Sequence, residues 1–153
     1  MEFISKSIEE TTQIASNFAE QLSRRAPSAK ATVVGLYGEL GSGKTTFMKY
    51  LAESFGIKET IQSPTFVIEK IYELVASSKQ QVSRFEHLIH IDAYRIEKEE
   101  EMINLGWQEI IADPKNIIFI EWPERITGIM PPHIVIKFEH VAKTKRGIII
   151  SNL

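Results

Sequence analysis

Hydrophobic residues near the start of the chain recur every three or four positions. Those that share one side of the repeat are Ile14, Ala15, Phe18, Ala19 and Leu22. This spacing is typical of an amphipathic helix. Ser7 and Glu10 match the S-x-x-E capping box that begins many helices, and Pro27 follows the basic pair at residues 24–25. The pattern therefore predicts a helix that begins after Ser7 and ends before Pro27.

Two uninterrupted apolar runs predict strands that are buried on both faces. They are residues 31–37 (ATVVGLY) and 116–121 (NIIFIE). Residues 44–55 instead repeat apolar side chains on one helical face, and Gly56 is a typical helix stop. That face consists of Phe47, Met48, Leu51 and Phe55. Residues 31–55 are thus predicted to form a strand, a tight turn and a helix in succession.

The remaining hydrophobic segments predict one more helix and two hairpins. Residues 66–75 and 84–92 are predicted strands, and the short polar link between them requires an antiparallel pair. Residues 96–105 are predicted to be helical, and a final hairpin is expected from residues 134–139 and 147–150. Strands that alternate with helices and end in hairpins predict an α/β fold with a mixed parallel and antiparallel central sheet flanked by helices.

Composition supports one domain over residues 1–153 and narrows the chemistry. The chain is 43% hydrophobic and 25% charged, which is a globular composition. Its 18 basic and 20 acidic side chains leave a net charge of −2, which argues against a strongly basic nucleic-acid-binding protein. It has no cysteine, no metal-ligand spacing among its four histidines and no apolar run long enough for a membrane span. We therefore expect a cytoplasmic domain without disulfides, a thiolate metal site or a membrane anchor.

The residues from Gly38 to Thr45 carry the sharpest chemical signal. They match G-x-x-x-x-G-K-[ST], the phosphate-binding loop, between a predicted strand and a predicted helix. Glycines let successive backbone N–H groups curve around a phosphate, and the N-terminus of the following helix favours an anion. Lys44 is expected to reach the terminal phosphates, and the Thr45 hydroxyl is expected to bind Mg²⁺.

An enzyme of this type also needs carboxylates that hold Mg²⁺ or orient water. Two predicted strands end in such groups, Asp92 and Glu121, where parallel strands meet a ligand crevice. A helix cap or a surface ion pair is the structural alternative for each, and spacing does not decide which of them binds metal. Asp113, which precedes Pro114, is expected to be a turn residue. No N-K-x-D guanine motif occurs, so ATP is favoured over GTP by elimination.

Neighbouring residues have both functional and structural interpretations. His90 faces the same side of its strand as Asp92; it is expected either to bond a carboxylate or phosphate or to be a structural histidine. Arg95 pairs either with phosphate or with the acidic run at residues 97–101. Trp122 is expected to pack in the core, and a lid over the site is the alternative.

Two loops have similar double interpretations. The segment Ser63-Pro64-Thr65-Phe66 follows the phosphate-loop helix, where a switch hydroxyl contacts Mg²⁺ or the γ-phosphate in some enzymes. On these residues alone, a proline-ended loop before a strand is favoured. The basic residues near the end of the chain fit a solvated hairpin turn better than a tRNA-binding patch. They are Lys143, Lys145 and Arg146.

Four segments in this order, GELGSGKTT, SPTF, HIDAYR and IEW, together resemble the bacterial TsaE (YjeE) ATPase family over essentially the whole chain. The resemblance implies a P-loop NTPase fold that binds ATP or ADP with Mg²⁺ and hydrolyses ATP slowly alone. It also implies a role in threonylcarbamoyladenosine modification of tRNA, with the partner proteins TsaB and TsaD and with tRNA reached through that complex. Ala93 departs from the family's HxDLYR pattern, and its side chain should face the core.

The resemblance also implies the roles of particular residues. The expected catalytic residues are Lys44, Asp92 and Glu121, and the expected magnesium ligands are Thr45 and Glu121. The expected nucleotide-binding residues are Thr11, Glu39, Leu40, Gly41, Ser42, Gly43, Lys44, Thr45 and Thr46. Residues 63–66 become the expected switch-like segment. The residues expected to surround the site are His90, Tyr94, Arg95 and Trp122.

Two other functions stay open at this point. A small-molecule or nucleotide kinase would need an acceptor pocket and a lid, for which the chain after Trp122 is short. A nucleotide-dependent interaction module would need Lys44 but not Glu121. None of the six arginines is an obvious transition-state finger, so we expect a slow enzyme whose partners complete the site or gate product release. No coiled-coil repeat or apolar stripe predicts self-association.

Overall fold

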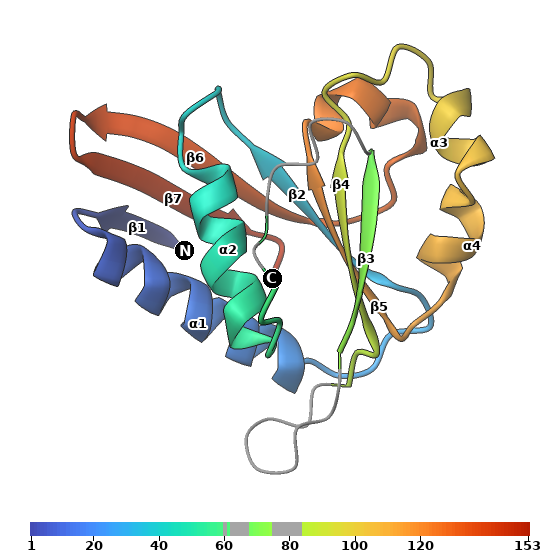
Figure 1. Ribbon diagram of the computed structural model, residues 1–153, viewed down its shortest axis with the longest axis horizontal. Coiled ribbons are helices and arrows are strands. Elements are labelled where there is room, and N and C mark those ends of the chain that lie inside the picture. The colour runs from blue at the N-terminus through green and yellow to red at the C-terminus, as the bar shows by residue number, and fades with distance from the viewer. Residues whose placement is uncertain (60, 62–67, 75–83) are drawn as a thin grey trace.

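The computed structural model describes residues 1–59, 61, 68–74 and 84–153. Its strands form one sheet in the order β1-β7-β6-β2-β5-β4-β3, and Figure 1 shows how the helices cover it. The strands are β1 (Glu2–Ser5), β2 (Thr32–Tyr37), β3 (Glu69–Glu73), β4 (His87–Asp92), β5 (Asn116–Glu121), β6 (Ile134–Ala142) and β7 (Lys145–Ser151). The helices are α1 (Ile8–Arg24), α2 (Lys44–Ser54), α3 (Glu100–Asn104), α4 (Trp107–Ala112) and the 3₁₀ helix η1 (Pro123–Ile129). Within the described part of the chain, no helix has the length and apolar character of a membrane span.

The sheet is mixed, as the sequence predicted. Strands β6, β2, β5 and β4 run parallel to their neighbours in that order. Strands β1, β7 and β3 pair antiparallel at the two sides. The predicted α/β class is therefore confirmed, and β2 lies between two parallel neighbours. That central position places the turn after β2 at the carboxyl end of the parallel strands, where ligands bind in open α/β sheets.

Two hydrophobic clusters fill the two faces of the sheet. Helices α1 and α2 cover one cluster, which includes Phe18, Phe47 and Phe119. The segment from α3 to η1 covers the other, which includes Trp107 and Ile120. Every residue of β5 is buried, and its side chains alternate between the two clusters. This is the double burial that its unbroken apolar run predicted.

The first helix begins and ends as predicted. The Ser7 hydroxyl accepts a hydrogen bond from the Glu10 N–H (3.2 Å). The Glu10 carboxylate accepts from the N–H of Lys6 (2.7 Å), one residue before the position that a standard capping box uses. Helix α2 is followed by Gly56 at φ +85°, a left-handed conformation that favours glycine.

The prediction of one helix over residues 96–105 is mostly wrong. Only α3 is helical in that segment, because the Glu101 carboxylate accepts the N–H groups of Glu97 (2.8 Å) and Lys98 (2.9 Å) and holds them in a turn. Gly106 is not only a stop: at φ +84° it also leads directly into α4, which was not predicted.

Other boundaries differ by a few residues. Strands β6 and β7 extend beyond the predicted hairpin, and β3 and β4 cover only part of the predicted segments. The rest of the first predicted strand, residues 66–67 and 75, lies outside the described residues. The predicted link between the two strands lies within residues 75–83, which are also outside them. Strand β1 and helix η1 were not predicted. Strand β1 is four residues long, so its weak alternation was easily missed; it pairs with β7 at the sheet edge.

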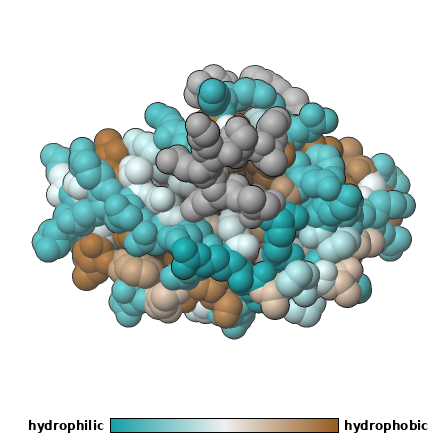
Figure 2. Space-filling view, turned by 90° about the horizontal axis from the view of Figure 1, so that it is seen from below, coloured by the Kyte–Doolittle hydropathy of each residue, from teal (hydrophilic) through white to brown (hydrophobic). Residues whose placement is uncertain are grey.

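Large apolar side chains are exposed in several separate places. In Figure 2, hydrophobic groups lie among hydrophilic ones on the part of this face that is not grey. The most exposed is Leu40, at 73%, in the loop between β2 and α2.

Candidate functional site

The phosphate-binding loop joins β2 to α2 in the setting that its motif requires. Gly38 has φ +147°, and a Cβ there would lie 2.8 Å from the Phe138 carbonyl oxygen. Gly43 has φ +106° and precedes α2 without a side-chain cap. The N–H groups of the first helical turn therefore have no acceptor within the helix. Such groups, at the positive end of the helix dipole, bind anions.

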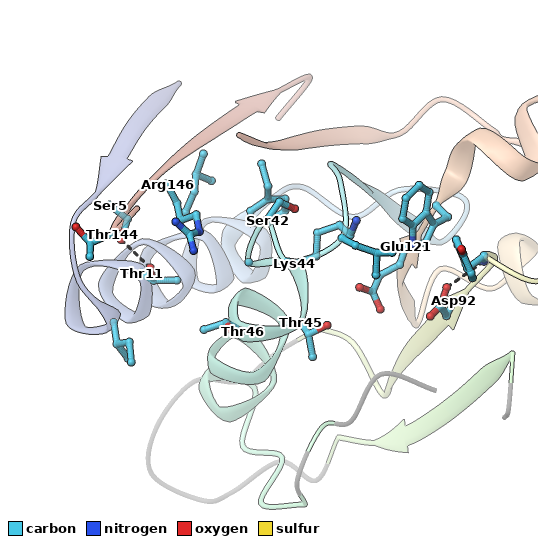
Figure 3. Close-up of a pocket in the computed structure, with 18 of the residues that line it drawn as sticks. Ser5, Thr11, Ser42, Lys44, Thr45, Thr46, Asp92, Glu121, Thr144 and Arg146 are labelled. Atoms are coloured by element: carbon cyan, nitrogen blue, oxygen red, sulfur yellow. Dashed lines mark hydrogen bonds between the residues drawn. The ribbon is translucent and has the colours of Figure 1, made fainter. Parts of the chain in front are cut away.

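This loop forms the floor of a pocket of about 790 Å³, within the size range of small-molecule sites. Figure 3 shows how its residues divide. Asp92 and Glu121 lie at one end, Lys44 and Thr45 lie beside them, and hydroxyl-bearing residues lie at the other end with Arg146.

Lys44 is almost fully buried and its ammonium is held in place. Its Nζ donates to the carbonyl oxygens of Gly38 and Glu39 and lies 4.3 Å from the centre of the Trp122 ring. Burial lowers the pKa of Lys44, while the negative charges of Glu121, Glu124 and Asp92 act in the opposite direction. The ammonium group therefore lies beside the loop, and a phosphate there would form stronger hydrogen bonds with it than the neutral carbonyl groups do.

Glu121 ends β5 and is 3% exposed. Its Oε2 lies 2.9 Å from Nε2 of His90, which is fully buried on β4. With Glu121 ionised, Nε2–H donates to the carboxylate, and the buried Nδ1 has no hydrogen-bond partner among the described residues. His90 thus bonds a carboxylate, one of its predicted roles. His90 does not line the pocket, so it positions the Glu121 carboxylate from the protein interior.

Replacing His90 by phenylalanine should destabilise the protein. The buried Glu121 carboxylate would lose its donor, which costs about 1–3 kcal/mol. His90→Gln keeps an N–H donor and should recover part of that loss. Urea unfolding of both variants and wild type would measure the difference. Equal losses in the two variants would mean that ring packing, rather than the bond to Glu121, is what stabilises this position.

Asp92 lies beside Glu121 in the register of β4 and β5, and both line the pocket. One Asp92 oxygen accepts the N–H of Tyr94 (3.0 Å), which fixes the turn after β4. The Tyr94 ring lies 5.1 Å from that of Trp122. The expectation that Trp122 packs in the core is wrong: it is half-buried, has φ +57°, and covers Lys44.

The structure brings most of the predicted site residues into this one pocket. Those that line it are Thr11, Leu40, Gly41, Ser42, Gly43, Lys44, Thr45, Thr46, Asp92, Tyr94, Arg95, Glu121 and Trp122. Glu39 does not line the pocket and contributes its carbonyl oxygen instead. Residues 63–66 lie outside the described residues. Asp113 is a turn residue as predicted, since its carboxylate accepts the Lys115 N–H (2.9 Å).

At the hydroxyl-lined end of the pocket, sequence reasoning identified Thr11 but missed Ser5, Thr144 and Arg146. Ser5 ends β1, and its Oγ lies 2.7 Å from Oγ1 of Thr11. Thr144 and Arg146 come from the β6–β7 hairpin, so the view of that turn as only a solvated hairpin is wrong for Arg146. Arg146 reaches Gly43, where an added Cβ would meet its Cγ at 4.0 Å. No local signal indicates this approach, because it depends on how β1 and β7 pair.

The pocket fits a nucleotide phosphate with a magnesium ion. Within the part of the chain that the structure describes, the buried Ser42 hydroxyl has no hydrogen-bond partner; it lies in the loop itself. Within residues 1–59, 61, 68–74 and 84–153, no three His, Cys, Asp or Glu side chains are placed so that they could hold a metal ion together. Mg²⁺ does not need such a cluster, because it is often held by one or two protein oxygens, phosphates and water. Thr45 and the two carboxylates supply oxygens of that kind.

Comparison with known proteins gives one consistent result. A family model described as "Threonylcarbamoyl adenosine biosynthesis protein TsaE" matches residues 5–148. The protein named tRNA threonylcarbamoyladenosine biosynthesis protein TsaE from Rickettsia prowazekii is 34% identical over 139 residues, which are 90% of this chain and 85% of the relative. Its namesake from Aquifex aeolicus is 30% identical over 150 residues, 97% and 96% of the two chains.

A solved structure supports the same conclusion. The crystal structure of Bacillus subtilis YdiB superposes with a TM-score of 0.71 at 28% sequence identity. The match covers 97% of this chain and 82% of that one. The predicted P-loop fold and the resemblance stated from the sequence are confirmed by these matches.

Proposed function

The chain belongs to the TsaE family of tRNA threonylcarbamoyladenosine biosynthesis proteins, and from that premise we propose that it is a magnesium-dependent ATPase. The observation that carries the proposal is the buried Lys44 at the start of α2, beside the phosphate-binding loop, with two strand-end carboxylates in the same pocket. We propose further that it acts with TsaB and TsaD in the cytoplasm and reaches tRNA through them.

The chain's own residues divide the work of holding ATP. Backbone N–H groups of residues 41–46 and the Lys44 ammonium would bind the phosphates. Thr45 and Glu121 would hold Mg²⁺. When bound, this ion would neutralise part of the negative charge of the phosphates. Asp92 would orient water. Thr11, at the other end of the pocket from Asp92, is the proposed contact of the adenine base.

The surface around the pocket supports an enzyme that needs partners. The rim of the pocket carries exposed apolar side chains, Leu40 and Ile8, which a docked protein would cover. Excluding water from a phosphate site strengthens its electrostatic interactions. Partner docking would therefore raise turnover.

ATP hydrolysis should be measured for this chain alone and with TsaB and TsaD. We expect strong stimulation by the partners, and its loss in Glu121→Gln. Glu109→Gln, an exposed glutamate on α4, is the matched control and should behave as wild type. Unchanged turnover with partners would refute the partner role. Fast turnover alone, with phosphate on a metabolite rather than in solution, would identify the kinase alternative instead.

A further inference from the structure

A second pocket lies at the opposite end of the parallel strands. It encloses about 300 Å³ beside Thr32 and Ile134, the first residues of β2 and β6; the phosphate loop follows the last residue of β2. Its polar lining consists of Arg25, Ser28, Thr32, Arg84, His133 and Asn152. None of the side chains that line it is acidic. Two arginines therefore share a hollow without a lining carboxylate.

Arg84 is poorly satisfied in this position. Its Nη2 donates to the Thr32 hydroxyl (3.0 Å), while its buried Nε has no hydrogen-bond acceptor among the described residues. The guanidinium lies 4.2 Å from the centre of the Phe85 ring, which orients it. Burial and the charge of Arg25 both lower the pKa of Arg84. The two cations thus repel each other, and an anion between them would offset that repulsion.

The histidine of this pocket is held by two hydrogen bonds. His133 Nδ1 lies 2.8 Å from the Pro131 carbonyl oxygen, to which only an N–H can donate. Its Nε2 lies 2.8 Å from the Tyr37 hydroxyl, an arrangement that suits the neutral ring with Nε2 as acceptor. The two guanidinium groups of the lining are positively charged, and their planar donors match phosphate oxygens.

We propose that the pocket of Arg25 and Arg84 is a second anion site that binds a phosphate group. The group belongs either to a small phosphate compound or to the backbone of RNA. The hydroxyls of Ser28 and Thr32 and the amide of Asn152 would complete its hydrogen bonds. The proposal does not depend on ATP hydrolysis at the first site, because the two pockets share no lining residue.

NMR titration of the full chain with inorganic phosphate, at constant ionic strength, tests the proposal. The amide signals of Thr32 and Asn152 report on this pocket, and those of Gly41 and Thr46 report separately on the phosphate loop. We expect the first pair to shift saturably in wild type. Arg25→Gln should weaken that binding about tenfold, as the loss of a charge-assisted hydrogen bond does. Arg24→Gln, which removes an exposed charge one residue away, should leave it unchanged.

A second titration, with RNA, distinguishes the two possible sources of the phosphate group. Arg25 is exposed, so its variant should fold; Arg84→Gln is a second test at the other guanidinium. A short single-stranded RNA that binds more tightly than inorganic phosphate, with the same dependence on Arg25, would assign the site to RNA. Binding of inorganic phosphate alone would assign it to small phosphate compounds. Shifts confined to the phosphate loop, or equal binding by Arg24→Gln and Arg25→Gln, would overturn the proposal.

Discussion

Replacing Lys44 by alanine should lower kcat/KM for ATP by about 10²–10³-fold, the usual loss when one preorganised donor to a developing charge is removed. The ammonium is already positioned by two loop carbonyls and the Trp122 ring, so it needs little rearrangement to meet a phosphate. Lys49→Ala removes an exposed lysine from the same helix and should keep wild-type turnover. Steady-state phosphate release measures both variants.

Replacing Lys44 by an uncharged residue should not unfold the protein. Because burial lowers the pKa of Lys44 below its ordinary 10.5, folding disfavours the charged form of this side chain. Between the lowered pKa and 10.5 the unfolded chain binds more protons than the folded one, so the Lys44 contribution to stability rises with pH in that window. Lys44→Met should therefore be more stable than wild type at pH 7, and the gap should narrow as pH rises towards 10.5.

Urea unfolding at several pH values, with Lys49→Met as the reference, measures this trend. A loss of turnover together with a loss of stability at pH 7 would contradict it. That result would mean that the bonds from Lys44 to Gly38 and Glu39 stabilise the loop more than the buried charge destabilises it. A gain in stability with lost activity would instead show that the fold bears the cost of a buried cation for the sake of the site.

The part of the site that the sequence predicted is local along the chain. A phosphate loop needs only one strand, one turn and one helix, so its eight residues carry the whole signal. Asp92 and Glu121 were predictable for a similar reason: each follows its own apolar strand, and parallel neighbours bring strand ends together. Their adjacency in the register of β4 and β5 confirms that reasoning.

The missed part depends on pairings between distant segments. Ser5 and Arg146 are Cα partners across β1 and β7, although they lie 141 positions apart along the chain. Strand β1 has only four residues, and neither strand contains a motif for ligand binding. Trp122 was misassigned because the sequence does not show its left-handed backbone conformation, with which the ring lies at the pocket over Lys44 and not in the core. A large aromatic residue next to a buried strand otherwise indicates core packing.

The chain has two tryptophans, and their replacement should have opposite consequences. Trp107→Ala should lower the free energy of unfolding by about 3–5 kcal/mol, the usual cost of emptying a buried aromatic position. Its side chain is 1% exposed, lies in the cluster under α3 and α4, and donates from Nε1 to the Ile129 carbonyl oxygen (3.1 Å). Denaturant unfolding measures the loss.

The folded fraction of Trp107→Ala should bind nucleotide normally, because its cluster lies on the face of the sheet opposite α2. Trp122→Ala is the matched control. It removes a half-buried ring that contacts Lys44 and Tyr94, so it should cost less stability and more nucleotide affinity. If Trp107→Ala weakened nucleotide binding as much as Trp122→Ala did, the two faces of the sheet would be coupled. The site would then depend on the α3–α4 layer, and not only on the loop that its motif identifies.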